Sequence, residues 1–282
     1  MSKKDENLIK FQNILDRYQA YAQAKLSEDK AETVYDYLEL AENASTKKTA
    51  LKYVKKALEL EPDNLDAGMM NINLTATSAQ SVIDKYRKLL DKATKSLENQ
   101  GYFSEDTIGD FWLILETRPY MRLRMEYIHN LILASKFRLA IAECEDMLRL
   151  CNNDNLGARF TLMHLYAYFE DEQAALALLK KYHNEKSTQL LLPMSLLYFK
   201  LDNLPKATRY LKELNEVNDG TYDFVKAMLE GDIGDYFDEL SAFGYRPFTI
   251  EEFIVELQEN SFLLMAVPVY YDWAVRKLKT MK

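Results

Sequence analysis

The stretch AIAEC at residues 140–144 is repeated as AALAL from residue 174 and as ATRYL from residue 207. Each copy begins with alanine and carries another apolar side chain four residues later, so both side chains lie on one face of a helix. The alanines Ala140, Ala174 and Ala207 are 34 and 33 residues apart. This period is typical of stacked helical hairpins, in which a small residue lets the second helix of each pair cross the first closely. The pattern predicts an all-α fold.

The first helices of these hairpins are expected upstream of the three alanines, at residues 120–133, 156–169 and 189–200. When the three segments are overlaid, their apolar positions coincide, beginning with Tyr127, Thr161 and Met194. Side chains repeated in this way form the apolar stripe of a helix that packs on one side.

A further unit lies upstream, where residues 50–64 read ALKYVKKALELEPDN. Its small Ala50, bulky Val54, second small residue Ala57 and helix-ending Pro62 resemble the second helix and linker of a tetratricopeptide repeat. The resemblance implies a right-handed α-α superhelix whose concave face is lined by the first helix of each hairpin. Such repeats commonly bind peptides or proteins along that face.

Three other segments are similar to a group of bacterial repeat proteins distantly related to the suppressor-of-tumorigenicity-7 family. They are ETRPYMRLR at 116–124, EDMLRLCNNDNLGAR at 145–159 and FGYRPFTIEEF at 243–253. This resemblance implies a helical-repeat fold and no particular reaction.

The whole chain, 1–282, is expected to form a single helical-repeat domain, because a solenoid can grow as one continuous body. We expect an N-terminal helix at 1–25, a repeat-like unit at 31–76, an irregular insertion at 77–117, three repeats at 119–219 and an acidic C-terminal cap at 220–282. Within the insertion, the apolar pattern predicts a long helix at 78–97 and a shorter one at 106–116. The insertion either changes the curvature of the solenoid or is a degenerate hairpin.

The cap is predicted to be a pair of helices. Thr249 and Glu252 have the spacing of a capping box, which predicts that a helix begins there, and Pro268 suits the first turn of the last helix. The aromatic residues of that last helix either close the end of the solenoid or form a weak dimer contact, so we expect a monomer or a weak dimer.

The formal net charge of −8 disfavours binding to nucleic acid or to an anionic membrane. The first ten residues lack the apolar run of a signal peptide, and we predict a cytoplasmic protein. Cys144 and Cys151 are two helical turns apart, beyond disulfide reach. Residues 216–260 hold 12 acidic side chains against Lys226 and Arg246, which either attract a basic partner or form a solvated face.

A candidate site lies around Pro119, which places Arg118 and Arg122 beside the N-terminal amides of a helix, where carboxylates or phosphates bind well. Alternatively, Arg122 and Glu126 simply pair on the helix surface. With the groove-lining positions of the tetratricopeptide register, the predicted peptide- or anion-binding residues are Arg118, Arg122, Met125, Glu126, His129, Arg159, Met163 and Tyr166.

These patterns favour a non-enzymatic scaffold that binds a protein or peptide, with the arginines contacting its acidic or C-terminal end. The alternative is an intracellular regulatory sensor of a small peptide or anionic metabolite. An enzyme acting through His129 and His164 ranks below both, because the sequence has no phosphate loop, nucleophile elbow or zinc motif. No cofactor and no metal are predicted.

Overall fold

The computed structural model describes residues 27–239 and 244–281, so the predicted helix at 1–25 lies outside the described residues. Within them the chain is helical and has no β-strand, which confirms the all-α prediction. The chain divides into two compact units, Met1–Gln100 and Gly101–Lys282, and the single domain stays a prediction. Each unit is described by itself.

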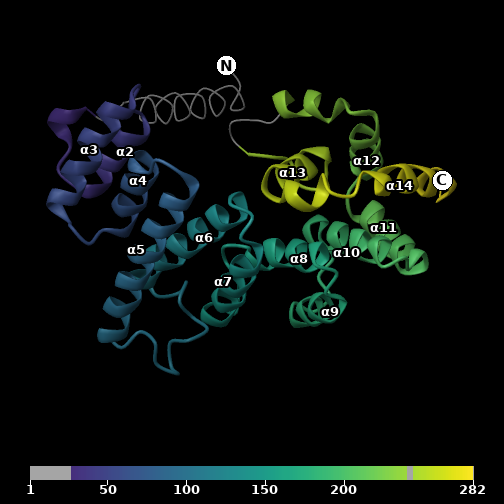
Figure 1. Cartoon of the computed structure of the whole chain (residues 1–282), viewed down its shortest axis with the longest axis horizontal. Coiled ribbons are helices and arrows are strands. Elements are labelled where there is room, and N and C mark those ends of the chain that lie inside the picture. Colours follow the sequence, from purple (N-terminus) through teal and green to yellow (C-terminus); the bar gives the residue numbers. More distant parts are fainter. Residues whose placement is uncertain (1–26, 240–243, 282) are drawn as a thin grey trace, which may run out of the picture. The chain divides into compact units, whose positions relative to one another are not determined.

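The described part of the first unit contains four α-helices after a short 3-10 turn (Figure 1). They are η1 (Glu28–Lys30), α2 (Val34–Glu42), α3 (Lys47–Leu60), α4 (Leu65–Thr75) and α5 (Ala79–Asn99). Each α-helix packs against the next one along the chain. The tetratricopeptide-like residues Ala50, Val54 and Ala57 of α3 are buried, as the sequence predicts, and Pro62 lies in the turn before α4. The long helix predicted at 78–97 is confirmed as α5.

The second unit contains three helical pairs followed by further C-terminal helices (Figure 1). The pairs and the turn before them are η2 (Leu115–Thr117), α6 (Arg118–Leu133) with α7 (Phe137–Leu150), α8 (Ala158–Tyr168) with α9 (Glu172–Lys181), and α10 (Thr188–Lys200) with α11 (Leu204–Val217). The remaining elements are α12 (Thr221–Glu230), η3 (Asp232–Glu239), α13 (Ile250–Leu264) and α14 (Pro268–Met281). The two helices of each pair contact each other, α7 also contacts α8, and α8 lies beside α10.

The turns inside the three pairs fix how the repeats align. Ser135, Glu170 and Asp202 each have a positive φ, of 56°, 60° and 55°, and occupy the same place between the first and second helix. Counted from these residues, the position of Ala140 and Ala207 corresponds to residue 175 in the middle pair, not to residue 174. The predicted alignment of the middle repeat is therefore wrong by one residue, because the linkers between pairs differ in length.

Burial supports the shifted alignment. Ala175 is fully buried, as Ala140 and Ala207 are, whereas Ala174 is half-buried. On the first helix of the middle pair, Leu162 is buried while Thr161, the residue expected there, is only partly covered. The sequence could not settle this point because two alanines stand side by side.

A pair of substitutions tests this register. Ala175→Leu is expected to lower the free energy of unfolding by about 2 kcal/mol, because there is no room for a larger side chain at a fully buried crossing point. Ala174→Leu is expected to change it by less than about 0.5 kcal/mol, since that position is partly open. Urea denaturation followed by circular dichroism compares the two, and equal losses would restore the original alignment.

The helix predicted at 106–116 is wrong. This segment is a series of turns that pairs its backbone with the end of α7: the N–H groups of Gly109 and Phe111 both donate to the Leu150 carbonyl oxygen at 3.1 Å, and Asn152 N–H donates to Gly109 O at 2.8 Å. Gly109 has a φ of 107°, which a helix does not allow. The apolar pattern arises instead because Phe111 is fully buried in this loop.

The predicted start of α13 near Thr249 and the position of Pro268 at the beginning of α14 are confirmed. The acidic segment is not simply a solvated face, because Glu252 and Glu256 are buried where α13 packs against α10 and α8, and Glu251 is covered and bonded by Arg246. The aromatic side chains of α14 that suggested a dimer contact are also buried within this unit: Tyr270, Tyr271 and Trp273.

Candidate binding cleft

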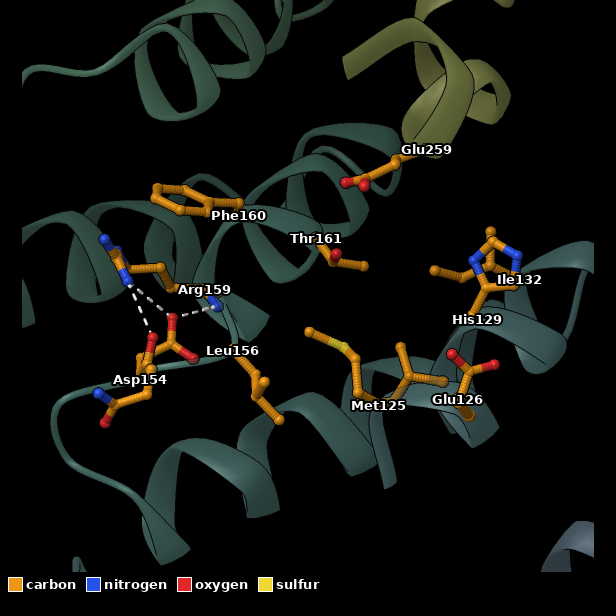
Figure 2. A pocket seen from close by; sticks show the side chains of 13 residues that line it. Met125, Glu126, His129, Ile132, Asp154, Leu156, Arg159, Phe160, Thr161 and Glu259 are labelled. Carbon is orange, nitrogen blue, oxygen red and sulfur yellow. Dashed lines mark hydrogen bonds and ion pairs between the residues drawn. The ribbon is translucent and has the colours of Figure 1, made fainter. Parts of the chain in front are cut away.

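A cleft of about 610 Å³ opens in the second unit between α6, the start of α8 with the linker before it, and α13 (Figure 2). Apolar side chains from α6 and α8, including Met125, Ile132 and Phe160, form much of its lining, and Leu156 joins them from the linker. Charged groups of both signs stand among them. A space of this size with a mixed lining suits one or two side chains of a bound segment.

The cleft contains four of the eight predicted site residues: Met125, Glu126, His129 and Arg159. The other four do not line it. Met163 is fully buried, and Tyr166 is buried with its hydroxyl donating to Glu145 Oε1 at 2.7 Å. Correcting the register of the middle repeat by one residue would not expose these positions, because every residue from Leu162 to Ala167 is buried. α8 is covered by α7, α9, α10 and α13, and the sequence did not predict that α13 packs on it.

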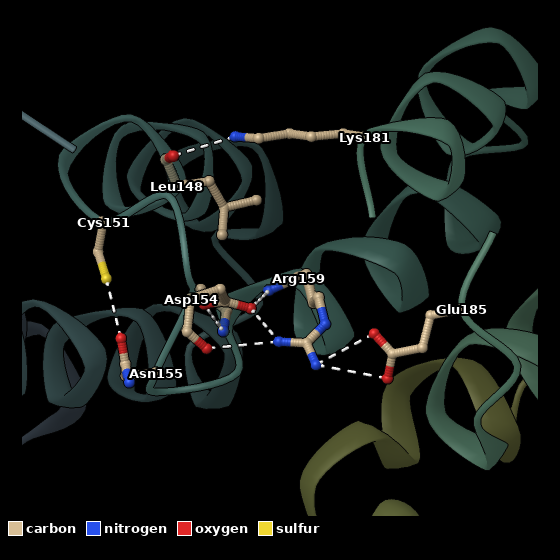
Figure 3. A network of polar contacts seen from close by, with 8 residues as sticks. Leu148, Cys151, Asp154, Asn155, Arg159, Lys181 and Glu185 are labelled. Carbon is tan, nitrogen blue, oxygen red and sulfur yellow. Dashed lines mark hydrogen bonds and ion pairs between the residues drawn. The ribbon is translucent and has the colours of Figure 1, made fainter. Parts of the chain in front are cut away.

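Arg159 is held in a network of ion pairs (Figure 3). Its Nη1 lies 3.0 Å from Asp154 Oδ2 and its Nη2 lies 3.2 Å from Glu185 Oε2. The guanidinium carbon is 4.0 Å from the centre of the Phe160 ring and 5.2 Å from the centre of the Tyr182 ring. Two carboxylates therefore compensate the single positive charge, and the guanidinium serves the structure of the cleft wall.

Asp154 connects this network to the beginning of α8. Its carboxylate accepts the N–H groups of Ala158 at 2.8 Å and Arg159 at 2.9 Å, which have no partner within the helix. Burial raises the pKa of Asp154, and its bonds with Arg159 act in the opposite direction. The residue itself adopts a φ of 47°, which aspartate tolerates better than most side chains.

The arginines at the start of α6 also form hydrogen bonds and ion pairs with other residues of this unit. Arg118 Nε donates to the Trp112 carbonyl oxygen at 2.7 Å. Arg124 is buried and forms ion pairs with Asp146 and, at 3.3 Å, with Glu143. Arg118 and Arg124 are thus occupied by loop and helix partners, and Arg122 is half-buried outside the cleft.

The carboxylates at the mouth of the cleft are those of Glu126 and Glu259, and His129 lies with them. Glu126 and His129 come from α6, and Glu259 faces them from α13 (Figure 2). All three are exposed, and among the described residues neither carboxylate has an ion-pair partner. Desolvation by the surrounding residues raises the pKa of Glu259, while the nearby His129 lowers it. Glu259 belongs to the acidic run that the sequence shows at 216–260. No sequence pattern predicted that it lies next to α6.

The second histidine does not join the first. His164 is fully buried on α8 and faces Glu256 of α13, and it is not part of the cleft lining. In the part of the chain that the structure describes, no three His, Cys, Asp or Glu side chains are placed to hold a metal ion. Cys144 and Cys151 are free and buried.

None of the helices within 27–239 and 244–281 combines the length and apolar character needed to cross a membrane. Comparisons with models of protein families, with curated proteins and with solved structures find no match to this chain.

Proposed function

We propose that the chain is a non-enzymatic scaffold that binds a peptide or protein segment, and that its helical pairs form a right-handed superhelix of the tetratricopeptide type. The contacts between successive pairs support this arrangement, as do the fully buried alanines at equivalent crossing points, Ala140, Ala175 and Ala207. A superhelix of this kind presents the first helix of each pair to a partner, and the cleft is lined by two such helices, α6 and α8.

The charge of the cleft favours a partner with a lysine or arginine side chain. Glu126 and Glu259 stand on two walls of the cleft, and Met125 and Phe160 supply apolar surface between them. The one arginine in the lining is compensated by its own carboxylates. These two glutamates, which form no ion pair with a lysine or arginine among the described residues, carry the proposal, and they favour a basic segment over the acidic end or anionic metabolite suggested by the arginines in the sequence.

Peptide binding tests the proposal. The probes are fluorescein-labelled dodecapeptides with lysine or arginine between leucine and methionine, and the same peptides with glutamate in the basic positions. We expect the basic peptides to bind and their affinity to fall with increasing salt, because exposed charges are screened. Changing both Glu126→Lys and Glu259→Lys is expected to weaken binding by about tenfold or more, measured by fluorescence anisotropy.

Glu216→Lys provides the matched control, because Glu216 is an exposed glutamate on α11 outside the cleft. It makes the same change in net charge per site and is expected to leave the affinity within about twofold. Preference for the acidic peptides, or equal binding by the wild type and the double variant, would refute the assignment of the cleft.

A further inference from the structure

α13 contacts α8 and α10 through a face that contains carboxyl and amide groups. Glu252, Glu256 and Asn260 are all buried on this helix. Buried carboxyl groups require partners or a bound proton, because transfer of an isolated charge out of water is costly. Glu252 accepts several hydrogen bonds. Glu256 accepts one hydrogen bond, from Asn260 Nδ2 at 3.1 Å, and it also faces His164.

His164 determines where a proton can reside in this contact. Its Nδ1 lies 2.9 Å from the carbonyl oxygen of Phe160, which can only accept, so Nδ1 carries the hydrogen of the neutral ring. Nε2 then holds a lone pair. This atom is buried without a hydrogen-bond partner in the described residues and lies 3.6 Å from Glu256 Oε2. The acid form of Glu256 is therefore the form that suits the neutral ring.

The surroundings of Glu256 favour that acid form. Burial raises its pKa to about 8, and the charges of Glu259 and Glu252 on the same helix add to the increase, while Asn260 acts in the opposite direction. Tyr245, in the segment before α13, interacts with the same three glutamates, and its own pKa is raised by burial and by them. No lysine or arginine in the described part of the chain forms an ion pair with Glu256.

The histidines near this face respond differently. Burial lowers the pKa of His164 to about 4 and keeps its ring neutral. His129 on α6 interacts with Glu259 and lies at the open mouth of the cleft. The closed contact between α13 and α8 thus contains one titratable proton, which the Glu256 carboxyl group holds next to the neutral imidazole of His164.

α13 departs from helical geometry close to this pair. Asn260, one turn after Glu256, has φ −122° and ψ 29°, and its Oδ1 is buried without a hydrogen-bond partner. A break in the hydrogen-bond ladder is where a helix bends. Asn260 is therefore the position at which we expect the segment of α13 that carries Glu256 to hinge.

We propose that α13 and α8 form a proton-dependent latch. The latch stays closed while Glu256 and His164 hold one proton between them, and it loosens when the pair loses that proton. An ionised Glu256 would face the lone pair of His164 and two neighbouring glutamates in a buried place. Because Glu259 follows Glu256 on α13 and forms a wall of the binding cleft, opening the latch also opens the cleft.

The pKa shifts of Glu256 and His164 define the pH range in which the contact between α13 and α8 should open. In an open state with ordinary values, Glu256 titrates near 4.5 and His164 near 6.5. Between pH 6.5 and 8 the closed state keeps a proton that the open state has released, so the closed state loses stability as the pH rises. Between pH 4.5 and 6.5 the open state instead gains a proton on His164, and the two effects offset. Opening should increase up to about thirtyfold from pH 6.5 to 8.

Hydrogen exchange of the full-length protein, measured from pH 6 to 9 and normalised for intrinsic rates, tests the latch. We expect the protection of the α13 amides in the wild type to fall at least about tenfold between pH 6.5 and 9. Glu256→Gln keeps a buried hydrogen-bonding group that cannot ionise, and it should retain protection at pH 9. Glu251→Gln is the matched control, because Glu251 is a buried glutamate of the same helix whose pKa is lowered by its bonds to Arg246. It should follow the wild type.

Constant protection in the wild type, or a wild-type response in Glu256→Gln, would overturn the proposal. If Glu256→Gln does not fold, the ¹⁵N chemical shifts of the His164 ring in the wild type decide instead. We expect them to report hydrogen on Nδ1 and to change between pH 7 and 9. A ring with hydrogen on Nε2, or no change in that range, would equally overturn it. None of these measurements uses a peptide, so their outcome is independent of the proposed binding function.

Discussion

Glu252→Ala is expected to lower the free energy of unfolding by about 4 kcal/mol, the largest effect of any single substitution considered for this chain. The carboxylate accepts hydrogen bonds from Thr188 Oγ1 at 2.8 Å, Gln189 Nε2 at 2.8 Å and Asn218 Nδ2 at 2.9 Å, and from Phe248 N–H at 3.0 Å. All three side-chain donors are buried. Alanine would leave Thr188 Oγ1 and Gln189 Nε2 without an acceptor, while Asn218 Nδ2 keeps its bonds to Thr188 Oγ1 at 3.0 Å and to the Thr249 carbonyl oxygen at 3.2 Å. A buried unsatisfied polar group costs more than the net value of its hydrogen bond.

Urea denaturation at pH 7, followed by circular dichroism, measures this loss. Glu259→Ala is the matched control, since it removes an exposed glutamate from the same helix, and we expect a change below about 0.5 kcal/mol. A loss of less than about 1 kcal/mol for Glu252→Ala would show that water or other acceptors replace the carboxylate, and that Glu252 does not fasten α13 to α10.

Arg159→Ala is expected to lower the free energy of unfolding by about 3 kcal/mol at pH 7, because it leaves the buried Asp154 carboxylate without its cation. The loss should be smaller at pH 5. Burial already raises the pKa of Asp154 in the intact network, and removal of the guanidinium raises it further. Since the folded variant then holds a proton that the unfolded chain releases, its stability falls as the pH rises from 5 to 7.

Urea denaturation at pH 5 and pH 7 compares this variant with Arg276→Ala. Arg276 is an exposed arginine on α14 whose partner, Asp272, lies one turn away on the same helix. Pairs of this kind contribute about 0.5 kcal/mol or less, so the control should be nearly neutral at both pH values. Equal losses for the two arginines would mean that the network around Asp154 adds no more than a surface pair.

Helix positions were predictable where a local signal exists. Ser78 caps the long helix α5, Pro62 separates α3 from α4, and Pro268 begins α14, each through a backbone effect that acts within a few residues. The helix predicted at 106–116 fails because its backbone pairs with the end of α7, which is a distant segment, and because Phe111 is buried in the resulting loop while Leu113 and Leu115 are exposed.

The candidate site was predictable only in part. Met125, Glu126, His129 and Arg159 line the cleft, as positions on first helices. The sequence could not show that the charge of Arg159 is compensated, because its partners Asp154 and Glu185 lie before α8 and after α9. Glu185 belongs to a linker that has no repeat signature.

By itself the sequence determined the all-α character, the paired helices and most of their ends, because apolar periodicity, caps and prolines act over one or two helical turns. Only the tertiary structure decided which glutamates are buried and which remain free at the cleft. Glu252 has the spacing of a local capping residue, yet it accepts hydrogen bonds from α10 and from Asn218, and Glu256 meets a histidine on α8. Burial and charge compensation depend on residues that are brought together from far apart in the chain, and sequence spacing does not encode those distances.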